Sequence, residues 1–164
     1  MRSIFREKSM EFFDILKVDR EDWHCFWERF CRINKDYMKE YLVENKITEE
    51  KALKILDSLS RPFLDSLRQE NEQIREIKRN TVSGISKMGN ELKLSDSDFT
   101  LYLISALGVN DTTIVKNTKD GGYLVLIDIV SLKKNDNINR LPEIAIDSAK
   151  TVRNILDRES KEEN

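Results

Sequence analysis

The side chains that most often bind metals or act as nucleophiles are scarce in this chain. It has a single histidine, His24, and two cysteines, Cys25 and Cys31, all in one aromatic-rich segment. Catalytic zinc sites usually have three protein ligands, and histidine is commonly among them. His24 and Cys25 are adjacent, so on a helix their side chains point about 100° apart and do not converge on one ion. We expect His24 to be a surface or packed residue and expect no metal or other cofactor.

The two cysteines predict a reducing environment. Cys25 and Cys31 are separated along a predicted helix by about 9 Å of rise, too far for a relaxed disulfide. We therefore expect reduced thiols buried in the core of a cytoplasmic protein. No stretch of the sequence has the roughly 18–20 apolar residues that a membrane span requires, so we expect no membrane association.

The remaining composition argues against two further classes of function. Gly121 and Gly122 form a bare pair in a turn signal, and no glycine-rich phosphate-binding loop is present. The 28 basic and 30 acidic side chains give a net charge of −2 and alternate finely. A nucleic-acid partner usually requires a clear basic excess, so we expect none.

Helical patterns dominate the segment from about 11 to 90. Apolar residues recur at steps of three and four, first in an aromatic stripe around Trp23 and then through 49–90. Asp19 and Thr48 are candidate N-caps. Pro62 should kink the second series or divide it near Ser60.

The pattern changes to that of strands near residue 98. We predict strands over 99–107, 112–116 and 123–130, the last nearly all apolar and so covered on both faces. A turn at 119–122 should join the last two. A final helix is expected over 141–157. The predicted fold is α+β. Long N-terminal helices (about 11–90) precede a small β-sheet with a C-terminal helix packed on it (about 98–158), in a single domain covering 1–164.

The order of these C-terminal elements resembles that of the zincin-type metallopeptidases. The likeness is to the predicted zinc-dependent proteases of bacteria, in which long N-terminal helices precede such a sheet. It rests on three consecutive strands, a polar loop and a helix opening Leu141-Pro142-Glu143-Ile144-Ala145, and on the aromatic block over 23–41. The resemblance implies that this last helix stands where the family carries His-Glu-x-x-His, whose histidines bind zinc and whose glutamate activates water.

This chain departs from that motif at every functional position. The resemblance places Asp147 at the first histidine, Ser148 at the glutamate and Thr151 at the second histidine. The family's third ligand lies beyond this helix, whereas the sequence ends at Asn164. We therefore predict a non-catalytic domain, a degenerate or truncated relative of a metalloprotease. In the alternative reading, the chain is an unrelated α+β domain, and Asp147 and Thr151 are polar positions at the edge of a packed face.

Binding could persist without catalysis. Zincin substrates lie along an edge strand, so the resemblance implies a peptide-binding edge formed by Thr112, Thr113, Ile114 and Val115. The expected partner is a protein or peptide. The alternative function is that of a helical interaction or regulatory protein, with the 49–90 helix as its partner or oligomerisation surface.

Overall fold

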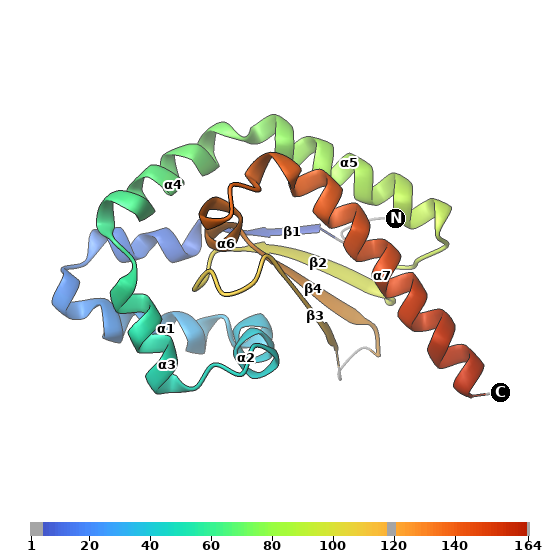
Figure 1. The fold of residues 1–164 in the computed structure, drawn as a ribbon, viewed down its shortest axis with the longest axis horizontal. Coiled ribbons are helices and arrows are strands. Elements are labelled where there is room, and N and C mark those ends of the chain that lie inside the picture. Colours follow the sequence, from blue (N-terminus) through green and yellow to red (C-terminus); the bar gives the residue numbers. More distant parts are fainter. Residues whose placement is uncertain (1–4, 118–120, 164) are drawn as a thin grey trace.

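A four-stranded sheet forms the centre of the computed structural model, which describes residues 5–117 and 121–163 (Figure 1). The strands are β1 (Phe5–Lys8), β2 (Phe99–Ile104), β3 (Thr112–Lys116) and β4 (Tyr123–Asp128), in the order β1-β2-β4-β3. The first three in that order run parallel, and β3 pairs antiparallel with β4 at the edge. Together with the helices this arrangement confirms the predicted α+β class.

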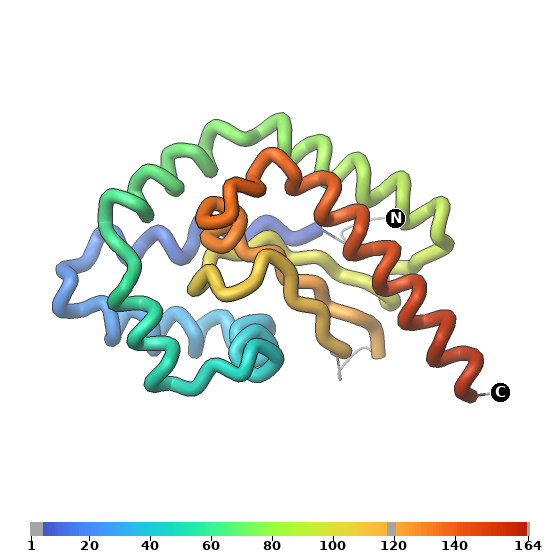
Figure 2. Tube along the Cα trace, viewed as in Figure 1, coloured from blue at the N-terminus to red at the C-terminus, as the bar shows by residue number. Residues whose placement is uncertain are grey.

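Helices cover both faces of the sheet. The N-terminal ones are η1 (Glu11–Lys17), η2 (Arg20–Asp22), α1 (Trp23–Ile33), α2 (Lys35–Glu44), α3 (Glu49–Ser58), α4 (Arg61–Gln73) and α5 (Arg75–Glu91). After β4 follow α6 (Ile129–Lys134), η3 (Ile138–Arg140) and α7 (Leu141–Glu162). Figures 1 and 2 show α5 and α7 side by side on one face and α1 and α2 on the other. All six residues of β4 are buried, as the apolar run predicted.

Several boundaries differ from the expected ones. Strand β1 was not predicted, and it adds a segment before residue 11 to the sheet by pairing Phe5 with Leu101. The expected 99–107 strand ends at Ile104, and the 123–130 strand ends at Asp128, whose carboxylate caps α6. The C-terminal helix continues past 157 to Glu162.

The 49–90 series forms three helices. Ser60 accepts a hydrogen bond from the backbone N–H of Phe63, 3.1 Å away, and Pro62 lies in the first turn of α4. The predicted division near Ser60 is therefore confirmed. A second break at Ile74 separates α4 from α5 and was not predicted.

The aromatic stripe of α1 lies in the core, but the cysteines do not share its position. Trp23, Phe26, Trp27 and Phe30 are buried. Cys25 is exposed, so the expectation of a core cysteine was wrong there, because the aromatic side chains fill the inward face of the helix. Cys31 is half-buried and packs against the core. Burial raises the pKa of the Cys31 thiol to about 12.

The two glycines before β4 serve different purposes. Gly121 has a φ of +76°, where only glycine is unstrained, although the expected turn's residues 119 and 120 lie outside the described part of the chain. Gly122 lies against the backbone after α5, where an added Cβ would be 1.9 Å from the carbonyl oxygen of Ser97. Close backbone approach, rather than phosphate binding, accounts for Gly122.

The glycine pair gives a direct test of this packing. We expect Gly122→Ala to lower the free energy of unfolding by about 2–3 kcal/mol or more, because backbone has to move. Gly121→Ala, which has nothing within 4 Å of the added Cβ, should cost only about 1–2 kcal/mol from its positive φ. Chemical denaturation measures both, and equal losses would contradict the close contact at Gly122.

Candidate functional site

A cleft of about 390 Å³ lies between the edge strand β3 and the C-terminal helix α7. We call it the β3–α7 cleft. Its lining residues come from β3 and the residue before it, from η3 and the loop before it, and from α7: Asp111, Thr112, Ile114, Asn137, Arg140, Ile144, Asp147, Ser148 and Thr151. The structure thus brings all three degenerate motif positions to the same cleft as two residues of the proposed peptide-binding strand.

The other two residues of that strand face the opposite side of the sheet. Thr113 and Val115 are buried, and the Thr113 hydroxyl accepts a hydrogen bond of 3.0 Å from the side-chain amide of Asn45, which follows α2. Thr112, Thr113, Ile114 and Val115 therefore divide into two side-chain sets. Only Thr112 and Ile114 line the cleft.

The register of β3 leaves its outer edge without partners. Asp111 and Asn117 make backbone hydrogen bonds with Asp128 and Gly122 of the β4 side. In an antiparallel pair these bonded positions alternate with positions whose backbone groups point away. The N–H and C=O groups of Thr112, Ile114 and Lys116 therefore face outward, and within 5–117 and 121–163 nothing hydrogen-bonds to them.

The three positions of the degenerate motif do not fit a zinc ion. Ser148 is buried, and its hydroxyl donates to the Ile144 carbonyl at 2.9 Å. The Thr151 hydroxyl donates to the Asp147 carbonyl at 2.9 Å, so both hydroxyls bond to their own helix. His24 belongs to α1 on the other face of the sheet, where its Nε2 lies 2.7 Å from Asp57. Asp147 alone remains as a conventional ligand.

Asp111 forms a fixed negative charge at one end of the cleft. Its carboxylate accepts hydrogen bonds from Ser131 (2.6 Å), Asn135 (2.9 Å) and Asn137 (2.9 Å). Partial burial by itself raises the pKa of Asp111, but these three hydrogen bonds outweigh it, so the pKa lies below its usual value. Asp111 was not among the predicted site residues, although two of its three partners are asparagines of the loop after α6.

Arg140 stands beside this carboxylate at the mouth of the cleft. Its guanidinium donates to Glu143 through two nitrogens, at 3.1 and 3.4 Å. The bonds and charge of Glu143, followed by the charges of Asp147 and Asp111, raise the pKa of Arg140. The cleft therefore has two acidic side chains and one basic side chain that already pairs with Glu143.

Behind the cleft, the carboxylate of Asp128 is fully enclosed. It accepts backbone hydrogen bonds from Ala106 (3.0 Å), Gly108 (2.7 Å) and Val130 (3.0 Å), and one from the Tyr41 hydroxyl (3.1 Å). Burial raises the pKa of Asp128, and burial together with this carboxylate raises that of Tyr41. Asp128 thereby fixes the loop that leads into β3.

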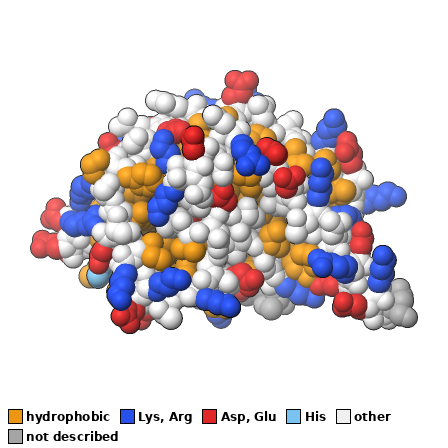
Figure 3. All heavy atoms as spheres, viewed as in Figure 1, with side chains coloured by type: hydrophobic (Ala, Val, Ile, Leu, Met, Phe, Trp, Pro, Cys, Tyr) orange, Lys and Arg blue, Asp and Glu red, His pale blue; other side chains and the backbone are white. Residues whose placement is uncertain are grey.

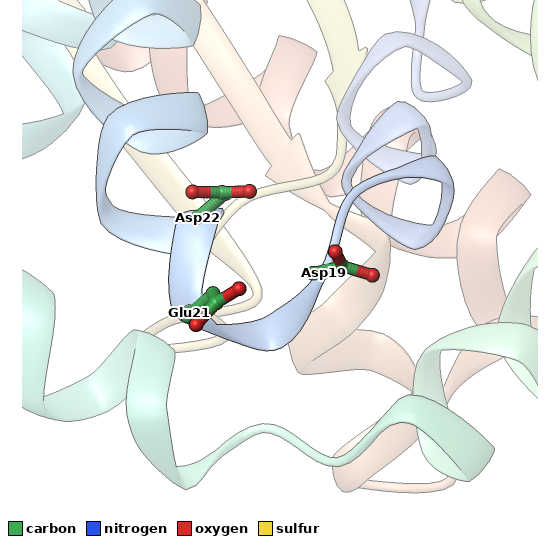
Figure 4. Close-up of side chains that lie close together, drawn as sticks. All are labelled: Asp19, Glu21 and Asp22. Carbon is green, nitrogen blue, oxygen red and sulfur yellow. The ribbon is translucent and has the colours of Figure 1, made fainter.

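A separate acidic group lies on the turn before α1. The carboxylates of Asp19, Glu21 and Asp22 lie within 4.8 Å of one another and are exposed (Figure 4). Because the three residues are near neighbours in one turn, their proximity follows from the chain itself. Elsewhere acidic and basic side chains are interspersed over the visible face (Figure 3).

The fold and cleft define an α+β domain with an open sheet edge beside a polar cleft. Comparisons of the chain with protein-family models, with curated proteins and with solved structures found no match. The resemblance to zincins thus rests on the sequence pattern alone. No described helix is both long and apolar enough to cross a membrane.

Removing one of the two acceptor oxygens of Asp128 should destabilise the fold. An asparagine offers one acceptor oxygen to four donors, so we expect Asp128→Asn to lower the free energy of unfolding by about 3 kcal/mol or more. Tyr41→Phe removes one donor and should cost about 1–2 kcal/mol. Urea denaturation with both variants tests this. If Asp128→Asn lowered the free energy of unfolding no more than Tyr41→Phe does, the Asp128 carboxylate would not be the common acceptor of all four donors.

The lowered pKa of Asp111 predicts a pH-dependent contribution to stability. The ionised carboxylate is favoured in the folded chain, so its stabilisation is present above the unfolded pKa of about 3.9 and is lost as the pH falls through the lower folded value. We expect the wild type to exceed Asp111→Asn in free energy of unfolding near pH 7, and the difference to shrink below pH ~4. Denaturation from pH 7 to 3 measures it, and a constant difference would refute the assignment.

Proposed function

We propose that this chain binds an extended segment of a protein or peptide by strand addition to β3, without catalysing a reaction on it. The observation that carries the proposal is the register of β3. The outward N–H and C=O groups of Thr112, Ile114 and Lys116 match the spacing of an added strand. Main-chain hydrogen bonds of this kind supply affinity without requiring a particular peptide sequence.

The β3–α7 cleft supports the same proposal. Side chains alternate along a strand, so every second residue of an added peptide would face the cleft beside Ile114 and Ile144. Strand β3 is also short and ends at the exposed Lys116, features that limit uncontrolled pairing at a sheet edge. The cleft beside an antiparallel edge strand is the place that the zincin resemblance implies for substrate.

The composition of the cleft supports binding rather than catalysis. A hydrolase would need a metal centre or a nucleophile paired with a base. Among the residues that line the cleft, Ser148 is of the type that most often acts as a nucleophile. Its hydroxyl is buried and donates a hydrogen bond to the Ile144 carbonyl. We place the protein in the cytoplasm, which accords with the unpaired state of Cys25 and Cys31.

The 49–90 segment offers less for the alternative function. Most of its large apolar side chains are in the protein's own core, and α5 packs along α7. In that segment Val82 is the one large apolar residue that is clearly exposed, at 45%. These observations favour β3 over the helices as the binding surface.

A proline at the centre of the edge tests strand addition. The Ile114 N–H points outward, so Ile114→Pro removes a donor for the peptide without breaking a bond to β4. We expect it to weaken binding of a fluorescein-labelled peptide, Thr-Val-Thr-Lys-Thr-Val-Thr, by about tenfold, the effect of losing roughly one hydrogen bond. Fluorescence anisotropy measures the affinity, and circular dichroism verifies the fold.

Ile114→Ala is the matched control, because it removes the same side chain but keeps the N–H. It should bind the peptide more tightly than the proline variant. In the wild type, peptide should slow hydrogen exchange at the outward-facing amides of Thr112 and Ile114. Exchange that is unchanged at both amides would show that the peptide does not add to β3.

A further inference from the structure

An added strand would carry its side chains past two different surroundings at the two ends of β3, of which the Thr112 end lies in the cleft. Thr112 and Lys116 lie at opposite ends of β3 on the side that faces α7. At the second end, Lys116 already forms an ion pair of 3.6 Å with Glu159 of α7. At the first end, Thr112 shares the cleft with Asp111, Arg140 and Asp147. A peptide residue beside Thr112 would therefore meet the charged part of the cleft.

At that end the acidic side chains that line the cleft outnumber the basic ones, because Asp111 and Asp147 share it with one guanidinium, that of Arg140. Arg140 is held by Glu143, and Asp111 bonds to neutral donors from Ser131, Asn135 and Asn137. The Asp147 side chain is exposed, and in the described part of the chain its carboxylate has neither a hydrogen bond nor an ion pair. Two carboxylates thus border the place where a peptide side chain would enter, one held by a hydrogen-bond network and one, Asp147, that acts on Arg140 only through its charge.

We propose that the cleft selects extended peptides that place a lysine or arginine side chain beside Thr112, between Asp111 and Asp147. This inference rests on the proposed strand addition and names the chemistry of the segment that is bound. The aliphatic stem of such a side chain would pack against Ile114 and Ile144, with its cationic head at the two carboxylates. An acidic side chain at that position would meet like charges.

Three labelled peptides that differ at one position test the selection. In the host Thr-Val-Thr-X-Thr-Val-Thr, X is lysine, glutamine or glutamate, and affinity is measured by fluorescence anisotropy. We expect lysine to bind about two- to fivefold more tightly than glutamine, the range of an exposed ion pair, and glutamate to bind most weakly. The preference should fall in 1 M NaCl, where charges are screened beyond about 3 Å.

A pair of variants on α7 tests whether Asp147 causes the preference for lysine over glutamine. Asp147→Asn should reduce the lysine-to-glutamine ratio towards one. Asp157→Asn makes the same charge change at an exposed position of α7 outside the cleft, where it loses an ion pair with Arg153, and should leave the ratio unchanged. Equal affinity for all three peptides, with the β3 amides still protected from exchange, would overturn the selection and leave strand addition intact. No protection of those amides with any peptide would overturn both.

Discussion

The fold depends on how one buried charge is accommodated at the end of β4. A carboxylate taken out of water costs several kcal/mol unless hydrogen bonds replace its hydration. Asp128 receives three backbone N–H groups and the Tyr41 hydroxyl. Its donors come from α2, from the loop after β2 and from the start of α6. A single side chain therefore joins α2, the loop after β2 and the start of α6 to the end of β4.

The same residue connects this anchor to the cleft. The backbone N–H of Asp128 donates to the carbonyl of Asp111 at 3.1 Å, which sets the register in which β3 begins. The Asp111 carboxylate in turn bonds to Ser131, Asn135 and Asn137. The outward direction of the β3 backbone and the position of one cleft charge are thus fixed before any peptide arrives. Preorganisation of this kind lowers the entropy cost of the proposed binding.

Local patterns in the sequence predicted an element correctly where the residues of one segment alone determine its structure. The apolar run of β4 predicted burial on both faces, and Ser60 with Pro62 predicted the start of α4. Strand β1 could not be predicted in this way, because its four residues, Phe5–Lys8, carry no alternating pattern and become a strand by pairing with β2. The end of β4 was also missed. Its apolar run continues through Ile129 and Val130, and periodicity alone does not separate a buried strand from a buried helix.

The candidate site shows the same division between local and long-range information. The resemblance indicated Asp147, Ser148 and Thr151 and a binding edge over 112–115, but it could not show which of these residues share a cleft. Asp111 was missed because its three partners lie 20 to 26 residues away. Which backbone groups of β3 face outward depends on its pairing with β4, and therefore required the structure.

The proposed binding and the proposed loss of catalysis have independent physical origins. A zinc-dependent reaction would need particular side chains on α7, and two of the three mapped positions carry hydroxyls that bond to that helix's own carbonyls. Strand addition needs backbone groups of β3, whose direction is set by Asp111, Asp128 and the register with β4. Substitutions along α7 can therefore remove a metal site without disturbing the sheet edge. The side chains that remain there, Asp147 above all, would then affect which peptide binds rather than what happens to it.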